Sequence, residues 1–94
     1  MTQTLYLSLK REYFEQIRDG EKLLEYRRCN DYWRKRLEAR GAYDQIVLTL
    51  GYPARDDHSR RITRPWRGYT IEAITHPHFG PDPVQVYAID VRPA

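Results

Sequence analysis

Short stretches with a two-residue apolar period are the feature that most constrains how this chain folds. In TLYLSLK, at residues 4–10, Leu5, Leu7 and Leu9 fall on one side of an extended segment. Four further segments with strand-like patterns occupy residues 20–28, 43–52, 67–75 and 84–91. Because the sequence has 94 residues, we expect one small domain, 1–94, with a single core.

Two helical patterns interrupt these strands. Residues 11–20 read REYFEQIRDG, with apolar side chains at helical spacing and Gly20 as the stop signal. Residues 30–41 read NDYWRKRLEARG, where Asn30 or Asp31 can act as the N-cap. Both segments therefore predict short helices.

The remaining connections are polar and rich in proline. Residues 53–65 carry several arginines between flanking prolines, which predicts an exposed loop, and HPHFGPDP at residues 76–83 predicts an irregular turn. The predicted order is strand, helix, strand, helix, strand, loop, strand, strand. This order favours an α+β fold, a small β-barrel of about five to six strands with two short helices.

Positive charge is concentrated in two segments, although the net charge is only +3. Residues 27–40 hold six cationic side chains against two acidic ones, and residues 55–67 hold five arginines against two aspartates. Clustered arginine on an otherwise acidic chain indicates a polyanionic partner. The alternative is a solvated face that only keeps the protein soluble.

Composition also limits the compartment and the cofactors. Cys29 is the single cysteine, and the sequence has neither a long apolar run nor a signal-peptide pattern, so we expect a cytoplasmic protein without a membrane partner. His76 and His78 form an H-x-H, but neither Cys29 nor His58 stands at ligand spacing to them. We therefore predict no metal and no cofactor.

The stretch GEKLLEYRR resembles a known family signature. Gly20, Lys22, Glu25 and Arg27 are similar to the G-x-K-x-x-E-x-R motif of the ASCH domain, a member of the PUA-like superfamily. YWRKRL, LGYP, RPWRG and HPHFG resemble segments of small ASCH proteins often encoded in phage and prophage regions. The resemblance covers nearly the whole chain. It implies a PUA-like barrel that recognises RNA or a nucleoside in a cleft beside the lysine-bearing strand.

The same stretch suggests how a base is read. Glu25 and Arg27 share a strand face, roughly 7 Å apart, so the guanidinium keeps the carboxylate ionised. The carboxylate can then accept a hydrogen bond from a base amine, while Lys22 or Arg27 binds a phosphate or a carbonyl oxygen. The alternative is an exposed ion pair, worth about 0–1 kcal/mol.

Arginine and aromatic residues alternate in the basic segments, which suits unstacked bases and phosphates. We therefore predict that RNA or a nucleotide is the partner, with DNA as the alternative. For Trp33, which stands at helical spacing from Leu37, we expect a core position rather than a binding role. The predicted nucleic-acid-binding residues beyond the motif are Arg34, Lys35, Arg36, Arg64, Trp66, Arg67, His76 and His78.

Two other functions stay open. Some similar ASCH proteins are amidohydrolases that remove the acyl group of acetylcytidine, and their catalytic lysine falls on Lys22. Their threonine falls on Glu25, however, and their glutamate has no counterpart in residues 76–83. Lys22 and Glu25 are catalytic candidates only if they exchange protons as a pair, and ribonuclease activity, also known in the wider family, matches no motif here. The second alternative is a phage-encoded module that binds a host protein.

Overall fold

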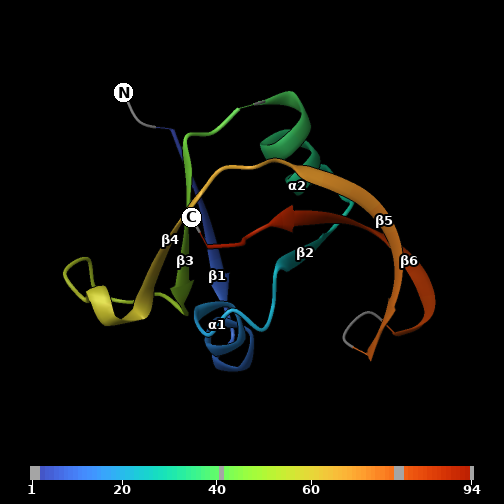
Figure 1. The fold of residues 1–94 in the computed structure, drawn as a ribbon. Coiled ribbons are helices and arrows are strands. Elements are labelled where there is room, and N and C mark those ends of the chain that lie inside the picture. The colour runs from blue at the N-terminus through green and yellow to red at the C-terminus, as the bar shows by residue number, and fades with distance from the viewer. Residues whose placement is uncertain (1–2, 41, 78–79, 94) are drawn as a thin grey trace.

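The computed structural model describes residues 3–40, 42–77 and 80–93 (Figure 1). In this part of the chain, six strands form two three-stranded sheets. The first sheet contains β1 (Thr4–Leu9), β3 (Gln45–Leu50) and β4 (Arg61–Pro65), in the order β1-β3-β4. β1 runs parallel to β3, whereas β4 is antiparallel to it.

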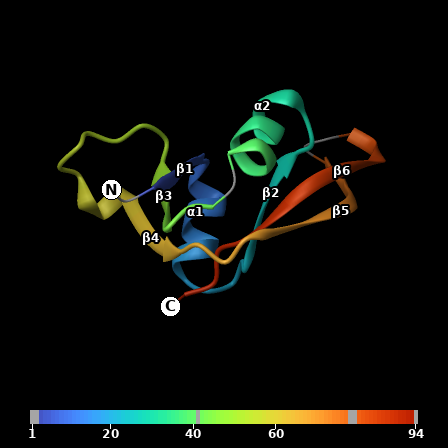
Figure 2. The same cartoon turned by 90° about the horizontal axis from the view of Figure 1, so that it is seen from above.

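The second sheet is antiparallel throughout. It contains β2 (Leu24–Arg28), β6 (Gly80–Asp90) and β5 (Tyr69–His76), in the order β2-β6-β5. β5 and β6 form a long ribbon that extends away from the first sheet (Figures 1 and 2). The register of this ribbon shifts between Ile74 and His76.

The helices occupy the two regions that the sequence predicts. α1 (Arg11–Arg18) is followed by Gly20, whose φ of +79° suits glycine. α2 (Asp31–Arg34) begins at Asn30, whose side chain accepts a hydrogen bond from the Trp33 amide at 3.0 Å. It continues into the π-helix η1 (Lys35–Ala39), and a short 3₁₀ turn, η2 (His58–Arg60), precedes β4.

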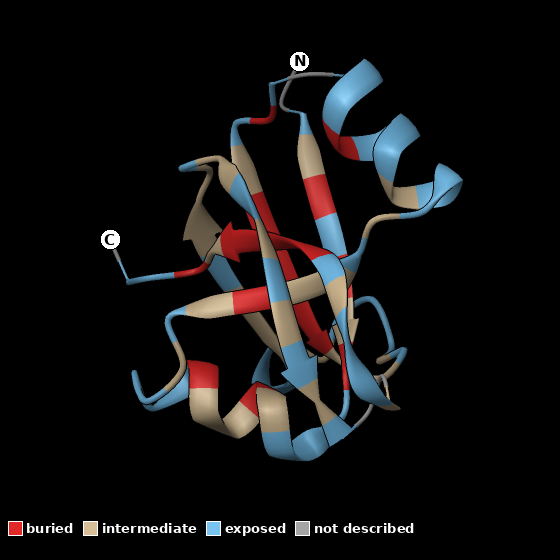
Figure 3. Ribbon diagram, turned by 90° about the vertical axis from the view of Figure 1, so that its right-hand side faces the viewer, coloured by how far each residue is buried: buried red, intermediate tan, exposed pale blue. Residues whose placement is uncertain are grey.

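The core lies between the two sheets, and α1 and η1 complete it. Figure 3 shows the buried segments of both sheets gathered in the middle of the molecule. The alternation along β1 turns Leu5, Leu7 and Leu9 inward, and Leu48 on β3 pairs with Leu7 in register. Other core side chains are those of Phe14, Ile17, Leu37, Ile46, Tyr87, Ile89 and Val91.

The predicted α+β fold is confirmed in this coarse form. Among the described residues, no strand of one sheet pairs with a strand of the other. The two sheets therefore do not form a closed, hydrogen-bonded barrel. The prediction of a loop over residues 53–65 is wrong for the last five residues, which form β4. β4 is an edge strand, and edge strands tolerate the arginines and the proline that suggested a loop.

Candidate binding cleft

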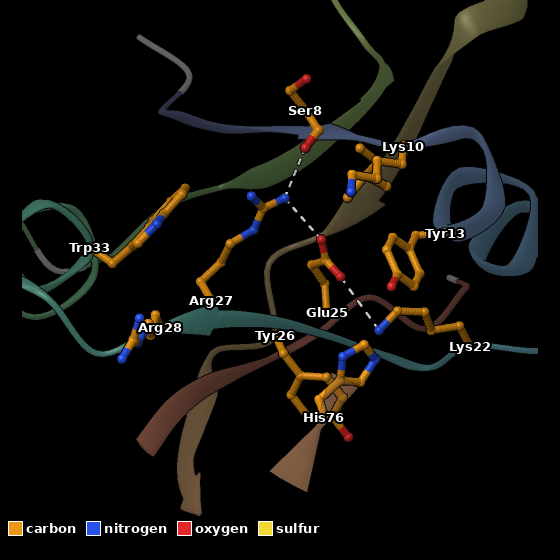
Figure 4. Close-up of a pocket in the computed structure, with 11 residues that line it drawn as sticks. Ser8, Lys10, Tyr13, Lys22, Glu25, Tyr26, Arg27, Arg28, Trp33 and His76 are labelled. Carbon is orange, nitrogen blue, oxygen red and sulfur yellow. Dashed lines mark hydrogen bonds and ion pairs between the residues drawn. The ribbon is translucent and has the colours of Figure 1, made fainter. Parts of the chain in front are cut away.

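A cavity of about 290 Å³, here called the cleft, opens beside the free edge of β1. β1, α1, β2, α2 and β5 all contribute to its wall, so no single element could form it alone. The lining residues are Ser8, Leu9, Lys10, Tyr13, Lys22, Glu25, Tyr26, Arg27, Arg28, Trp33 and His76, most of which are labelled in Figure 4.

Glu25 lies at the centre of the cleft. Although it is charged, it is only 6% exposed. Its Oε2 accepts a hydrogen bond from the Arg27 guanidinium at 2.8 Å, and its Oε1 lies 3.4 Å from Lys22 Nζ (Figure 4). A buried carboxylate is costly unless it is paired, and here two cations share it. Carboxylate oxygens have more lone pairs than these contacts use, so Glu25 can accept a further bond.

Arg27 connects the two sheets across the cleft. Its guanidinium donates to Ser8 O on β1 at 3.0 Å as well as to Glu25 on β2. It also lies 5.2 Å from the centre of the Trp33 ring, within cation–π range. Its Nε is buried without a hydrogen-bond partner among the described residues. Arg27 therefore fixes the relative position of the strands that line the cleft.

Lys22 closes the opposite side of the carboxylate. Its Nζ donates to Leu24 O and lies 4.7 Å from the Tyr26 ring centre and 5.8 Å from that of Tyr13. The backbone amide of Lys22 donates to Gln16 O, which ties the segment between α1 and β2 to the helix. The ammonium group is thus held over two aromatic faces, beside Glu25.

The wall of the cleft is aromatic and its charge is positive. Tyr13, Tyr26 and Trp33 supply ring surfaces, and the centroid of the His76 ring lies 6.4 Å from that of Tyr13. The cations are those of Lys10, Lys22, Arg27 and Arg28, and Glu25 is the single lining carboxylate among the described residues. This arrangement suits a flat ring that carries both donors and acceptors and is attached to an anion.

Two hydroxyl groups hold the segment that brings Trp33 to the cleft. Tyr43 Oη donates to Arg36 O at 2.6 Å, and Tyr87 Oη donates to the Glu38 carboxylate. Burial, together with the neighbouring Glu38 carboxylate, raises the pKa of Tyr87 above its usual range. The π-turn hydrogen bond from Arg40 N to Lys35 O belongs to the same segment.

The structure brings four of the predicted site residues together in the cleft: Lys22, Glu25, Arg27 and His76. His78 lies outside the described residues. Arg34, Lys35 and Arg36 are exposed on α2 and η1, next to the Trp33 side of the cleft. Arg34 forms an ion pair with Asp31, and the Arg36 guanidinium lies 4.3 Å from the Tyr32 ring centre.

The structure places the other three predicted residues elsewhere. Arg64 donates to Val91 O and Ile17 O at 3.2 Å each, so it holds chain segments together. The Trp66 ring is half-buried against the core, and its centroid lies 5.2 Å from that of Tyr43. Arg67 is exposed and donates to Pro93 O at 3.0 Å. None of the three lines the cleft.

Sequence reasoning missed several lining residues. The helical pattern assigns Tyr13 to the apolar face of α1, and Tyr26 stands on β2 between two motif residues without belonging to the motif. Lys10 and Arg28 lie at the ends of β1 and β2, each beside another cation in the sequence, so neither was singled out as a site residue. Two of these residues had a signal in the sequence: Tyr26 stands directly between Glu25 and Arg27, and Arg28 belongs to the basic segment at residues 27–40.

Comparison with known proteins yields no relative. No protein-family model matches the sequence, and neither a curated protein nor a solved structure gives a significant match. The described residues contain no group of three or more His, Cys, Asp or Glu side chains that could hold a metal ion. Within the same ranges, no helix is both long and apolar enough to cross a membrane.

Proposed function

We propose that this protein binds RNA or a nucleotide and that one base occupies the cleft. The observation that carries the proposal is Glu25, a buried carboxylate held between Lys22 and Arg27 inside an aromatic cavity. A volume of about 290 Å³ is at the lower end of small-molecule pockets, which suits a single base or nucleoside. The proposal includes a PUA-like fold, in which the two sheets are the halves of a barrel that is not completely closed by hydrogen bonds. It also includes a cytoplasmic location.

The charges of the cleft suit the edge of a base. The Glu25 carboxylate accepts a hydrogen bond from an exocyclic amine, while Arg27 and Lys22 donate to a ring carbonyl. Tyr13 and Tyr26 offer faces for stacking, worth about 1–3 kcal/mol per base. Single-stranded RNA or a free nucleotide exposes such an edge, whereas a closed duplex does not. DNA shares the phosphate chemistry and is the alternative polymer.

Exposed cations next to the cleft are suited to phosphates. Arg28 lies at its rim, and Arg34, Lys35 and Arg36 follow on α2 and η1. Removing one phosphate-binding side chain from a single-stranded complex reduces the salt slope by about 0.7. Arg64 and Arg67 already donate to backbone carbonyls, so they contribute less to the proposal than the sequence suggested.

Glu25→Gln tests the proposal directly, because it keeps the shape of the side chain and removes its charge. We expect affinity for the preferred nucleotide to fall by about 1–3 kcal/mol and affinity for other nucleotides to change little. Calorimetric titration with each ribonucleotide in turn measures the effect. Glu21→Gln is the matched control, since Glu21 is exposed and lies outside the cleft.

A uniform loss for all nucleotides would contradict base reading. Thermal unfolding of the variant is measured in parallel, because removing the carboxylate leaves Lys22 and Arg27 without their shared anion. Arg28→Ala provides a second variant that does not touch the ion pairs, and we expect it to weaken binding of every nucleotide alike. Capture of a protein instead of RNA after nuclease treatment would favour the host-binding alternative.

A second candidate function is hydrolysis of a modified nucleoside or of RNA. It is favoured by the distance of 3.4 Å between Lys22 Nζ and Glu25 Oε1 inside the cleft, which is within reach for proton exchange through small movements. Incubation with acylated cytidines and with single-stranded RNA, beside Lys22→Ala, tests it. Turnover that disappears in Lys22→Ala supports an enzyme, and binding without turnover supports a binding module.

A further inference from the structure

A second concave surface, here called the groove, lies on the outer face of the first sheet. It is a shallow, open depression of about 900 Å³, lined by Tyr6, Val47, Pro53, Arg55, His58, Arg61 and Thr63. Tyr6, Val47 and Thr63 stand side by side on β1, β3 and β4 in register. The other lining residues come from the segment between β3 and β4 and from the start of β4. No lining residue is shared with the cleft.

Hydrogen bonds hold the wall of the groove in place. Gly51 O accepts from Ser8 Oγ at 3.0 Å and from Thr49 Oγ1 at 2.8 Å, which fixes the chain where it leaves β3. The Arg61 guanidinium donates to Pro53 O and Ala54 O at 3.4 and 3.2 Å. A surface that is already formed loses less conformational entropy when a ligand binds.

The cations that line the groove form no ion pair with the described residues. Arg55 makes no hydrogen bond or ion pair with the residues that the structure describes, and Arg61 donates only to neutral carbonyls. The nearby Asp57 is engaged elsewhere, since it pairs with Arg60 at 3.3 Å and accepts from Ser59. No carboxylate of the described ranges lines the groove, so its charge complements an anion.

Exposed tyrosines accompany these cations. Tyr6 lies within the groove and is 64% exposed, and Tyr52, next to its wall at Pro53, is 95% exposed. Exposed aromatic rings among arginines suit successive unstacked bases with their phosphates. An acidic peptide would satisfy the arginines but would leave both rings unused.

Strand β1 connects the groove to the cleft. Ser8 lines the cleft, and Tyr6, two residues earlier on the same face of β1, lines the groove. Their Cα atoms are therefore roughly 7 Å apart by strand geometry. β1 is the edge strand of its sheet, so no other strand of that sheet lies between its outer edge and the groove at Tyr6.

We propose that the groove binds the nucleotides that flank the base held in the cleft, so that one single strand occupies both surfaces. Arg55 and Arg61 bind its phosphates, and Tyr6 and Tyr52 stack on its bases. This inference rests on the proposed function for the identity of the ligand, but it concerns separate residues. It predicts a dependence on ligand length that a cleft alone would not produce.

The test compares two probes with the same variants. One probe is a fluorescein-labelled, mixed-sequence RNA of about twelve nucleotides, and the other is a mixture of ribonucleoside 5′-monophosphates. We expect Arg55→Ala to weaken binding of the long RNA and to reduce its salt slope by about 0.7, as for one phosphate contact. Tyr52→Ala weakens it with the slope unchanged, and neither variant changes monophosphate affinity. Arg92→Ala is the charge-matched control, because Arg92 is exposed and lines neither surface.

The outcomes separate the two proposals. If the long RNA binds Arg55→Ala and Tyr52→Ala as it binds the unmodified protein, the groove proposal is overturned, whatever Glu25→Gln does. If both variants weaken the long RNA while monophosphates show no binding, the groove binds nucleic acid by itself, and both base binding in the cleft and the strand shared by the two surfaces are overturned. Binding of polyglutamate but not RNA, abolished in Arg55→Ala, overturns the nucleotide assignment. Absence of binding to any probe at low salt overturns both.

Discussion

The cleft and the groove each contain a partly buried arginine and at least one aromatic residue, but among the described residues only the cleft is lined by a carboxylate. Arg27 in the cleft is paired with Glu25, whereas Arg61 in the groove donates to two loop carbonyls. In both arginines, Nε is buried without a hydrogen-bond partner in the described part of the chain. The difference indicates that the cleft is suited to a ligand that both donates and accepts hydrogen bonds. The groove is suited to an anionic group such as a phosphate, whatever the sequence of the nucleic acid that carries it.

The two surfaces also differ in what supports them. The cleft takes residues from five elements and lies against the core, while the groove lies on the outer side of one sheet under a loop. Changes near the cleft should therefore alter global stability, and changes in the groove should remain more local. The following predictions, from the largest expected effect to the smallest, test this difference.

Leu48 and Val47 compare the two faces of a single strand. Leu48 faces the core and is fully buried, so Leu48→Ala should lower the free energy of unfolding by about 2–5 kcal/mol. Val47 lines the groove, and Val47→Ala removes less buried surface, with an expected loss of about 1–2 kcal/mol. Urea unfolding measures both changes. Equal losses would show that the groove face is as closely packed as the core.

Arg27→Ala and Arg61→Ala compare the two arginines. Arg27→Ala removes charged hydrogen bonds to Glu25 and to Ser8 O and leaves a buried carboxylate with one cation, so we expect a loss of about 2–3 kcal/mol in unfolding free energy. Arg61→Ala removes contacts to a loop and should cost about 1 kcal/mol. In Arg61→Ala, we expect amide hydrogen exchange to become faster only in residues 51–57. A larger loss for Arg61→Ala would reverse the comparison.

Tyr87→Phe tests the support of the Trp33 side of the cleft. This substitution removes the hydrogen bond from Tyr87 to the exposed Glu38 carboxylate, so we expect the free energy of unfolding to fall by about 1 kcal/mol near neutral pH. Because the pKa of Tyr87 is raised by burial in the folded protein, the unfolded chain releases this proton first as pH rises. The pKa of a tyrosine in the unfolded chain is about 10. The contribution of Tyr87 to the free energy of unfolding is therefore fully present below that pH and is lost as the pH rises above it.

The measurement is unfolding by urea at several alkaline pH values. We expect the unmodified protein to lose more stability above that pH than Tyr87→Phe does. Tyr52→Phe is the matched control, because Tyr52 is 95% exposed and should not change the pH dependence. Parallel pH profiles for the unmodified protein and Tyr87→Phe would contradict a buried, protonated Tyr87.

Local patterns in the sequence were enough to predict most elements. The alternation of Leu5, Leu7 and Leu9 defines the buried face of β1, and the Asn30 cap defines the start of α2. The spacing of Glu25 and Arg27 places both on one face of β2, where they form the expected ion pair. These features depend on periods of two or 3.6 residues and on neighbours a few positions apart, so a single sequence contains them.

Only the tertiary structure decided which side chains share a surface. It placed Tyr13 and Trp33 in the cleft with Glu25, directed Arg64 toward backbone carbonyls and put the Trp66 ring against the core. It also formed β4 from a segment whose arginines and proline suggested a loop. These outcomes depend on pairing between distant segments, such as β3 with β4 and β2 with β6. Local propensity does not encode that pairing, because it is set by how the two sheets bury one common core.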